Sequence, residues 1–142
     1  MSESPKWEFF LAHAASDVGA AEGLYVLLSP SARVFLDTKC LSPGDDWDQV
    51  LPQAQATSSI SIILISPNTP KAYYQREEIA SAIAMSRAGN HRVVPVYLQG
   101  WPSDPGHIPY GLRIKQGLMV PDEGGLDGVA TKLLLLRDKL KG

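Results

Sequence analysis

An aromatic residue and a carboxylate one helical turn apart, Tyr74 and Glu78, form the pair best suited to chemistry in this sequence. Apolar residues of the stretch 73–83 recur at roughly 100° per residue, which predicts a helix on which Glu77 faces solvent and Glu78 lies at the rim of the apolar face. The run at 59–66 before it is almost wholly apolar and predicts a strand covered on both faces. A carboxylate just past such a strand lies where open α/β sheets bind ligands. The alternative is that both glutamates only favour the start of a helix through its dipole.

Other candidate side chains follow the remaining predicted strands. His13, in the turn after the first strand, could contact a ligand phosphate or ribose, or only hydrogen-bond within its turn. Asp37 closes the second strand and could bind a ligand or form a turn. Trp47 could stack on an aromatic ligand or anchor its helix to the core. Cys40 lies in a loop with no nearby base to make its thiol reactive.

Composition and missing motifs exclude several classes of function. A net charge of −2 with scattered basic residues gives no basic surplus for binding nucleic acid. The single cysteine permits neither an internal disulfide nor a thiol metal cluster and indicates a reducing, cytoplasmic setting. No apolar run approaches the roughly 18 residues of a membrane span. The sequence has no G-x-G-x-x-G after the first strand and no G-x-S-x-G, and its three histidines lack the spacing of a zinc site.

The elements that must position the candidate residues alternate between strand and helix. Strands are predicted at residues 7–12, 33–36, 59–66, 92–98 and 117–120, with helices after each of them. Right-handed crossovers then give one α/β domain, residues 1–142, with a flavodoxin-like five-stranded parallel sheet of order 2-1-3-4-5 and helices on both faces. Pro95 lacks a ladder donor, which argues against the most central position for its strand.

Finer expectations concern caps, loops and faces. Ser16 or Asp17 is predicted to cap the first helix. Residues 38–46 are predicted to form a loop with Pro43 and Gly44 as turn residues. The last helix, about 126–140, is predicted to place four apolar side chains on one stripe. These are Val129, Leu133, Leu136 and Leu140.

Four segments give the chain a resemblance to Toll/interleukin-1 receptor (TIR) domains over nearly its whole length. Residues 9–17, FFLAHAASD, are similar to the "FISHASED" opening of bacterial members. Residues 34–47 resemble the second strand and the BB loop, and 62–68, IILISPN, are similar to "VLSPN". The pair Tyr74-x-x-x-Glu78 resembles the W-x-x-x-E of the enzymatic branch. The order and spacing of the segments together make the resemblance specific.

The resemblance implies an NAD⁺ glycohydrolase, a nucleosidase that breaks the nicotinamide–ribose bond and in which Glu78 is the catalytic residue. Water would give ADP-ribose, and an internal hydroxyl would give a cyclic ADP-ribose. NAD⁺ is then the substrate, and no cofactor or metal is implied. Tyr74 replaces the usual Trp, and Ala14 and Ala15 stand where animal enzymes carry arginines. The residues expected to bind substrate are Phe10, His13, Ser16, Asp37, Trp47 and Tyr74.

The resemblance also implies partners. The domain is expected to self-associate head to tail into a filament through a loop that includes Leu41, Pro43 and Gly44. It is expected to be the cytoplasmic effector of a bacterial immune, antiphage or toxin system, with a sensor domain or partner on its C-terminal side and no direct contact with nucleic acid or membrane. The alternative is a non-catalytic TIR module that acts as an adaptor.

Overall fold

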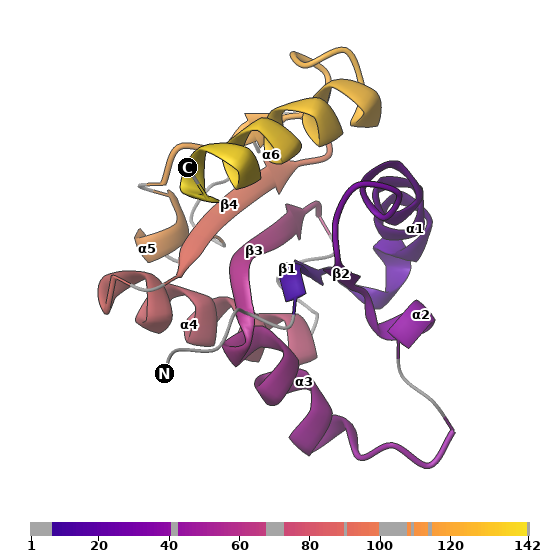
Figure 1. Cartoon of the computed structure of the whole chain (residues 1–142), viewed down its shortest axis with the longest axis vertical. Helices are drawn as coiled ribbons and strands as arrows, with labels where there is room; N and C mark the ends of the chain where they lie inside the picture. The colour runs from indigo at the N-terminus through magenta and orange to yellow at the C-terminus, as the bar shows by residue number, and fades with distance from the viewer. Residues whose placement is uncertain are drawn as a thin grey trace.

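The computed structural model of the 142-residue chain describes residues 7–40, 43–67, 73–89, 91–99, 108, 110–113 and 115–141. Side chains are described for these residues except 47, 48, 73–77, 87, 110, 113 and 141. Strands and helices alternate along the chain as the sequence predicted (Figure 1). The elements are β1 (Trp7–Ala12), η1 (Ala15–Asp17), α1 (Val18–Leu28), β2 (Val34–Phe35), α2 (Asp37–Cys40), α3 (Trp47–Ala56), β3 (Ser58–Ile65), α4 (Tyr73–Arg87), β4 (Arg92–Tyr97), α5 (Tyr110–Arg113), β5 (Leu118–Met119) and α6 (Leu126–Lys141).

The five strands form one parallel sheet of order β2-β1-β3-β4-β5, which confirms the predicted topology. β3 lies at its centre, and six of its eight residues from Ile60 onward are fully or nearly fully buried. A strand buried on both faces needs apolar side chains at consecutive positions, which the run of isoleucines and leucine in β3 supplies. Because all the strands are parallel, the loops that follow β1, β2 and β3 meet at one edge of the sheet.

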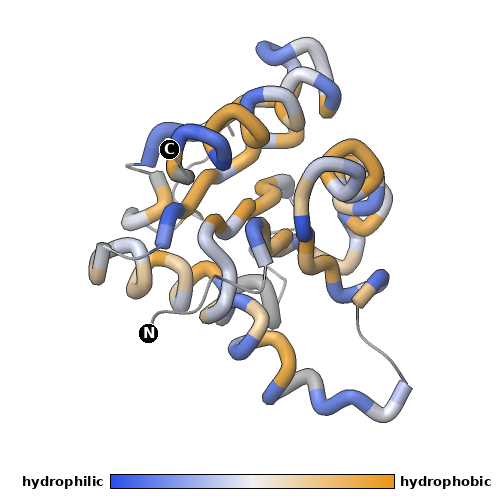
Figure 2. The backbone as a smooth tube through the Cα atoms, viewed as in Figure 1, coloured by the Kyte–Doolittle hydropathy of each residue, from blue (hydrophilic) through white to orange (hydrophobic). Residues whose placement is uncertain are grey.

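Two hydrophobic cores lie on opposite faces of the sheet. One packs α1 and α6 against alternate residues of the strands, such as Phe9, Ile62 and Val94. The other packs α3, α4 and α5 against the intervening residues, such as Phe10 and Ile63. In Figure 1 the two sets of helices lie on either side of the strands, and Figure 2 shows hydrophobic residues running along the strands between them.

The structure corrects several local expectations. Residues 38–40 belong to the helical turn α2 and not to a loop. Neither Ser16 nor Asp17 caps α1 with its side chain: Asp17 occupies the N-cap position without such a bond, and its carboxylate accepts a hydrogen bond from the Ser66 hydroxyl at 2.5 Å. In α6 Leu140 is 43 % exposed, so the predicted apolar stripe ends one turn earlier.

β4 lies next to the sheet edge, as Pro95 suggested. The Tyr97 carbonyl accepts from Val120 N–H at 2.9 Å, whereas Leu98 N–H donates to Ile65 on the β3 side at 3.0 Å. Since backbone groups alternate along a strand, the nitrogen of Pro95 faces β5, where a missing donor is tolerated. Within the described residues, no helix is long and apolar enough to cross a bilayer.

Candidate active site

Three titratable side chains meet at the edge of the sheet where the strands end. His13 directly follows β1, Asp37 opens α2 after β2, and Glu78 lies in the second turn of α4, which follows β3. β1 and β3 are neighbours although a whole βα unit separates them in sequence, so the sheet order reverses here. Such a switch point is where open α/β sheets bind ligands.

His13 and Asp37 form a hydrogen-bonded ion pair. His13 Nδ1 lies 2.7 Å from the Ala14 carbonyl oxygen, which can only accept, so this nitrogen carries a proton. His13 Nε2 lies 2.9 Å from Asp37 Oδ1. Burial opposes protonation, but these two hydrogen bonds and the negative charges of Asp37 and Glu78 raise the pKa of His13 above its ordinary value. With both ring nitrogens donating, His13 is an imidazolium.

The Asp37 carboxylate is the anionic half of the pair. Burial alone would raise the pKa of Asp37, but the hydrogen bond and charge of His13 and a 2.8 Å hydrogen bond from the Thr38 backbone lower it below its ordinary value. The Asp37 side chain remains 22 % exposed, against 5 % for His13. Asp37 can therefore accept a further hydrogen bond from solvent or a ligand while it holds His13.

Glu78 is the chemically unusual member of the cluster. Burial, and then the negative charge of Asp37, raise the pKa of Glu78 to about 8, although the imidazolium of His13 lowers it. Within the described part of the chain, no side chain or backbone group donates a hydrogen bond to its carboxyl. Around neutral pH the carboxyl is therefore largely protonated, and it ionises just above. A group of this kind can stabilise positive charge when ionised and can take up a proton released in a reaction.

The three side chains face one small cavity, named here the carboxyl-edge pocket. Its described lining is Phe10, Leu11, His13, Phe35, Asp37, Leu51 and Glu78. The rings of Phe10 and Phe35 stack in its wall with centroids 5.4 Å apart. The cavity volume is about 10 Å³, room for roughly one water molecule. A ligand larger than a water molecule must therefore lie at the mouth of the pocket unless the walls move.

Buried hydrogen bonds link the Glu78 backbone carbonyl to Gln55, Ser61 and His91. Gln55, 1 % exposed in α3, donates from Nε2 to the Glu78 backbone carbonyl at 2.9 Å and to Ser61 Oγ at 3.1 Å. Ser61 Oγ lies 2.7 Å from His91 Nε2, and His91 Nδ1 lies 3.0 Å from the Ser58 carbonyl oxygen. The carbonyl fixes the proton on Nδ1, so Nε2 accepts from Ser61. Burial lowers the pKa of His91, which is therefore neutral.

Four of the residues predicted to form the site line the same pocket. These are Phe10, His13, Asp37 and Glu78. Ser16 is exposed in η1 and does not line it. The side chains of Trp47 and Tyr74, and all of Leu41, lie outside the described residues. Pro43 and Gly44 are exposed, and the backbone at Gly44 has φ +91°, a conformation that favours glycine.

Sequence reasoning missed the supporting residues. Gln55 falls on the inward face of α3 beside the buried Leu51 and Ala54. A polar residue on an apolar helix face was the available signal, because a buried amide must find partners. Phe35 and Leu51 carried no functional signal, since any core strand or helix has such residues. Among the described residues, no group of three or more acidic, histidine or cysteine side chains could hold a metal ion.

Comparisons with known proteins agree with one another. A family model described as TIR domain matches residues 9–121. A curated relative from Brucella melitensis, named probable 2′ cyclic ADP-D-ribose synthase TcpB, is 25 % identical over 99 residues, 68 % of this chain and 40 % of the relative. The protein of that name from Brucella abortus is 26 % identical over the same shares. The chain thus spans about two-fifths of the length of these relatives.

Solved structures share the fold. The TIR domain of the Toll-related receptor TRR-2 from Hydra magnipapillata has a TM-score of 0.69 at 19 % identity, covering 94 % of this chain and 98 % of that one. A metazoan TIR-STING receptor from C. gigas has a TM-score of 0.75 at 18 % identity, covering 94 % and 41 %. The likeness extends over nearly all of the chain, which shows the architecture at identities too low to show more.

Proposed function

The chain belongs to the TIR domain family, and we propose that it cleaves NAD⁺ at the nicotinamide–ribose bond, with Glu78 as the catalytic residue. The observation that carries this proposal is the Glu78 carboxyl with a pKa of about 8, facing the carboxyl-edge pocket beside the His13–Asp37 pair. The names of the Brucella relatives, which concern cyclic ADP-ribose synthesis, support the same class of chemistry.

The reaction needs little from the protein beyond one well-placed carboxylate. Breaking the bond sends its electron pair to the nicotinamide ring, which leaves neutral and requires no general acid. Positive charge develops on the ribose, as in glycoside hydrolysis, and an ionised Glu78 stabilises it. Water, or a hydroxyl of the same molecule, then attacks the ribose. The proton released by that hydroxyl can pass to Glu78, whose raised pKa suits it as the base.

The neighbouring side chains have proposed roles in binding. Asp37 holds His13 with one oxygen and is exposed enough to accept a hydrogen bond from a ribose hydroxyl. Phe10 supplies part of the apolar lining of the pocket. Ser16 could contribute at the mouth through its turn, and Trp47 and Tyr74 remain predictions from the resemblance. The products proposed are nicotinamide with either ADP-ribose or a cyclic ADP-ribose.

The test is nicotinamide release, measured by chromatography after incubation of concentrated protein with NAD⁺, with mass spectrometry of the second product. Glu78→Ala is expected to lower the rate by at least about 10²- to 10³-fold. The matched control is Glu77→Ala, which removes the adjacent carboxylate of the same helix and is expected to change the rate little. Equal losses in both variants would show that the wrong carboxylate was chosen. No release at any protein concentration would favour a non-catalytic interaction module.

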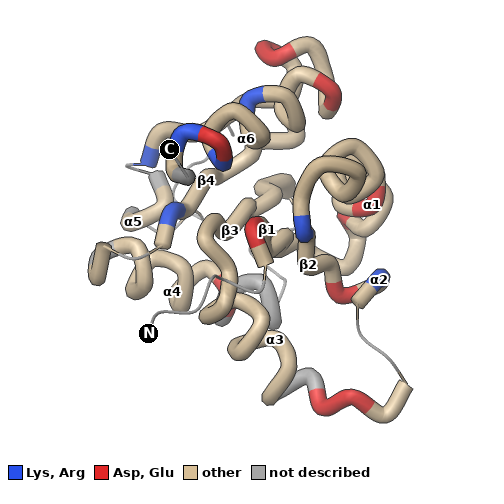
Figure 3. Tube along the Cα trace, in the orientation of Figure 1, with Lys and Arg blue, Asp and Glu red and all other residues tan. Residues whose placement is uncertain are grey.

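We also propose that activity depends on self-association through residues 38–46. Described residues 43–46 are exposed in the loop before α3, and Figure 3 shows acidic residues there. Specific activity is expected to rise with protein concentration, and Leu41→Asp is expected to remove the rise. Leu140→Asp makes the same change at an exposed position near the end of α6 and should keep it. Flat specific activity over a wide concentration range, in protein shown to be monomeric throughout, would contradict this.

A further inference from the structure

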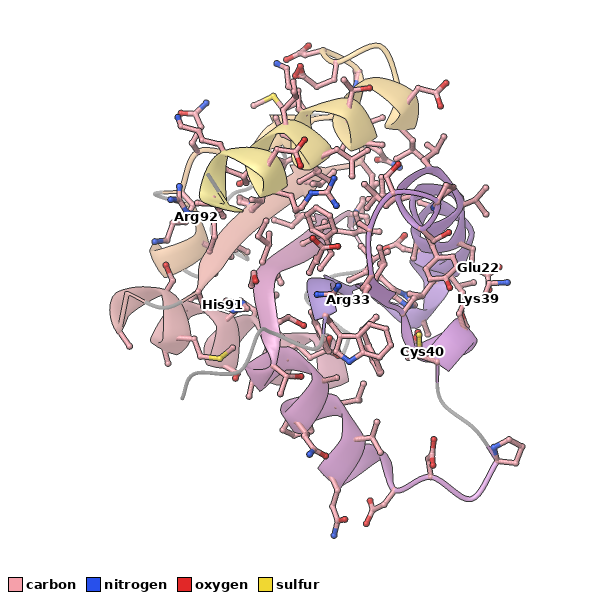
Figure 4. All side chains as sticks on the ribbon, viewed as in Figure 1. Glu22, Arg33, Lys39, Cys40, His91 and Arg92 are labelled. Atoms are coloured by element: carbon pink, nitrogen blue, oxygen red, sulfur yellow. The ribbon has the colours of Figure 1, made fainter. Side chains whose placement is uncertain are left out.

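A second and larger cavity lies at the other end of the strands, beside the first residues of β4. It has a volume of about 470 Å³ and is bounded by the end of α4, the start of β4, the segment before β5 and the middle of α6. It is named here the cation-lined cavity, with Ser86, His91, Arg92, Lys115, Lys132 and Leu133 among its walls. Figure 4 marks His91 and Arg92 at the start of β4, away from the side that carries Lys39 and Cys40.

The cavity exists because β5 is short. β5 pairs with β4 only at Val96 and Tyr97, so no described strand lies beside β4 at Val93 on that side. Backbone groups of Val93 point the same way as those of Tyr97 by the alternation of the strand, toward the cavity that Val93 lines. The segment before β5 passes close to β4 at Gly117, where a Cβ would lie 2.8 Å from the Pro95 carbonyl oxygen. Backbone therefore forms part of the wall on two sides.

The charged groups around the cavity are cations from three different elements. Arg92 begins β4, Lys115 precedes β5 and Lys132 lies in α6. Lys132 is paired with Glu123 at 2.8 Å. Lys115 is half-buried, and its ammonium donates to Ser86 Oγ at 2.8 Å. Within the described part of the chain, neither Arg92 nor Lys115 has an acidic partner, and no acidic side chain lines the cavity.

The remaining walls are apolar and uncharged. Leu133 is buried, Leu118 and Leu136 are half-buried, and all three line the cavity. His91 adds no charge, since both its ring nitrogens are used by Ser58 and Ser61. A volume of 470 Å³ is in the range of small-ligand sites and far exceeds one phosphate ion. Anion binding by Arg and Lys beside an apolar floor favours a molecule that has both kinds of group.

We propose that the cation-lined cavity binds a small organic phosphate, a phosphomonoester whose dianion lies between Arg92 and Lys115 and whose compact apolar or aromatic group covers Leu133 and Leu136. The Lys115 ammonium has three N–H donors and uses one of them on Ser86, so others can donate to a phosphate. The Arg92 guanidinium can donate to two phosphate oxygens at once. This site is separate from the carboxyl-edge pocket, and the proposal does not depend on NAD⁺ cleavage.

The probe is 1-naphthyl phosphate, which is dianionic at pH 7.5 and combines a phosphate with a flat apolar ring. Titration of the whole ¹⁵N-labelled chain, followed by two-dimensional NMR, is expected to show saturable shifts at Arg92, Val93, Gly117 and Lys132 and none at His13 or Glu78. Inorganic phosphate is expected to bind at least tenfold more weakly because it leaves the apolar wall uncovered. 1-Naphthol, which has no charge for the cations, should not saturate.

Substitutions test which side chains contact 1-naphthyl phosphate. Arg92→Gln and Lys115→Gln are each expected to weaken binding of 1-naphthyl phosphate about tenfold, as the loss of a charge-assisted hydrogen bond implies. Lys139→Gln, an exposed lysine of α6 that does not line the cavity, should leave it unchanged. The proposal is overturned if the probe does not saturate, if it shifts only the carboxyl-edge pocket, or if Arg92→Gln and Lys115→Gln bind it normally. Loss of self-association in these variants without probe binding would instead assign the cavity to an acidic segment of a second copy.

Discussion

The carboxyl-edge pocket lies beside β1 and β2 and the cation-lined cavity beside β4 and β5, and the two differ in size and in the charges of their walls. The first is about 10 Å³, and it contains the Glu78 carboxyl, with a pKa of about 8, beside the His13–Asp37 ion pair. The second is about 470 Å³, and the charged side chains in its lining are two lysines and an arginine. Cavity volume and the position of the perturbed carboxyl therefore point to different regions of the molecule. The small pocket contains Glu78, whose raised pKa is typical of a catalytic carboxyl. The large cavity has room for a small ligand and cationic side chains in its wall.

The largest expected effect is the stability cost of an ionised Glu78 in its pocket. Because its folded-state pKa is about 8 against an ordinary value near 4.5, the folded protein holds a proton that the unfolded chain releases. Its contribution to stability is therefore fully present below about pH 4.5 and is lost as the pH rises through about 8. Glu78→Gln keeps the shape and removes the charge, so at pH 8.5 it is expected to be more stable than the native chain by about 2–4 kcal/mol.

Urea unfolding at pH 5.5 and pH 8.5 measures this difference, which should shrink markedly at the lower pH. Glu22→Gln is the control, because it makes the same change at a side chain that is 40 % exposed on α1 and should alter the free energy of unfolding by less than about 0.5 kcal/mol. A Glu78→Gln variant that gains nothing at pH 8.5 would mean that the carboxyl is well solvated, and the contrast between the two regions would weaken.

The next largest effect is expected from His13, whose imidazolium lies beside the Glu78 carboxyl. The positive charge of His13 lowers the pKa of Glu78, so His13→Gln should move its ionisation to higher pH. If NAD⁺ cleavage requires ionised Glu78, a shift of about one unit lowers the rate at pH 7 roughly tenfold, and the rates converge above about pH 9.5.

A pH–rate profile distinguishes this role from a merely structural one. A structural defect would lower the rate by the same factor at every pH, whereas an electrostatic one moves the midpoint. Titration of the ¹³C-labelled Glu78 carboxyl by NMR gives the same answer without relying on activity. An unchanged midpoint in His13→Gln would remove His13 from the control of Glu78 and leave it as a residue that positions Asp37.

A smaller effect is expected from the support behind the pocket. Gln55→Leu leaves the Ser61 hydroxyl and the Glu78 carbonyl without a buried donor, at a cost of about 1–3 kcal/mol in the free energy of unfolding. Displacement of Glu78 should lower NAD⁺ cleavage about three- to tenfold. Gln53→Leu makes the same change two residues earlier at an exposed position and should do neither. Equal stability loss in both variants would show that the network contributes nothing specific.

The sequence was sufficient for the fold because the fold depends on repeated local patterns. The apolar run of β3, the alternation of strand and helix and the proline in β4 each indicate burial or order, and together they predicted the topology that is observed. The ends of elements were less predictable. The Asp17 carboxylate could bond either the helix start or the distant Ser66, and only the packed loops decide between them.

The sequence predicts those site residues that follow a strand. It does not predict properties that depend on residues brought together only by folding. His13 and Asp37 directly follow strands, and Glu78 lies in the second turn of the helix after β3, so parallel topology brings them to one edge. The pKa of Glu78 depends on burial and on Asp37, and neither effect can be read from its neighbours in sequence. The cation-lined cavity was missed altogether, since Arg92, Lys115 and Lys132 are scattered along the chain and meet only because β5 is short.

The smallest expected effect tests whether the two regions are independent. His91 lines the cation-lined cavity and is joined through Ser61 and Gln55 to the Glu78 carbonyl, so a physical connection exists. Connection alone does not produce coupling, because a ligand shifts an equilibrium only if two arrangements bind it differently. Here the hydrogen bonds of His91 fix its tautomer, and burial keeps its ring neutral by lowering its pKa.

Saturating 1-naphthyl phosphate is therefore expected to change NAD⁺ cleavage by less than about twofold, since the cavity and the pocket share no lining residue and nothing couples them by itself. The direction of that residual effect is set by charge: an added anion raises the pKa of Glu78 and slows the reaction slightly at pH 7. Inhibition that persists in Lys115→Gln would show competition by the probe at the carboxyl-edge pocket. A change above about fivefold that disappears in Lys115→Gln, with a matching shift in the Glu78 ¹³C titration, would show that the hydrogen bonds from His91 to Glu78 have a second arrangement and that the large cavity regulates the small pocket.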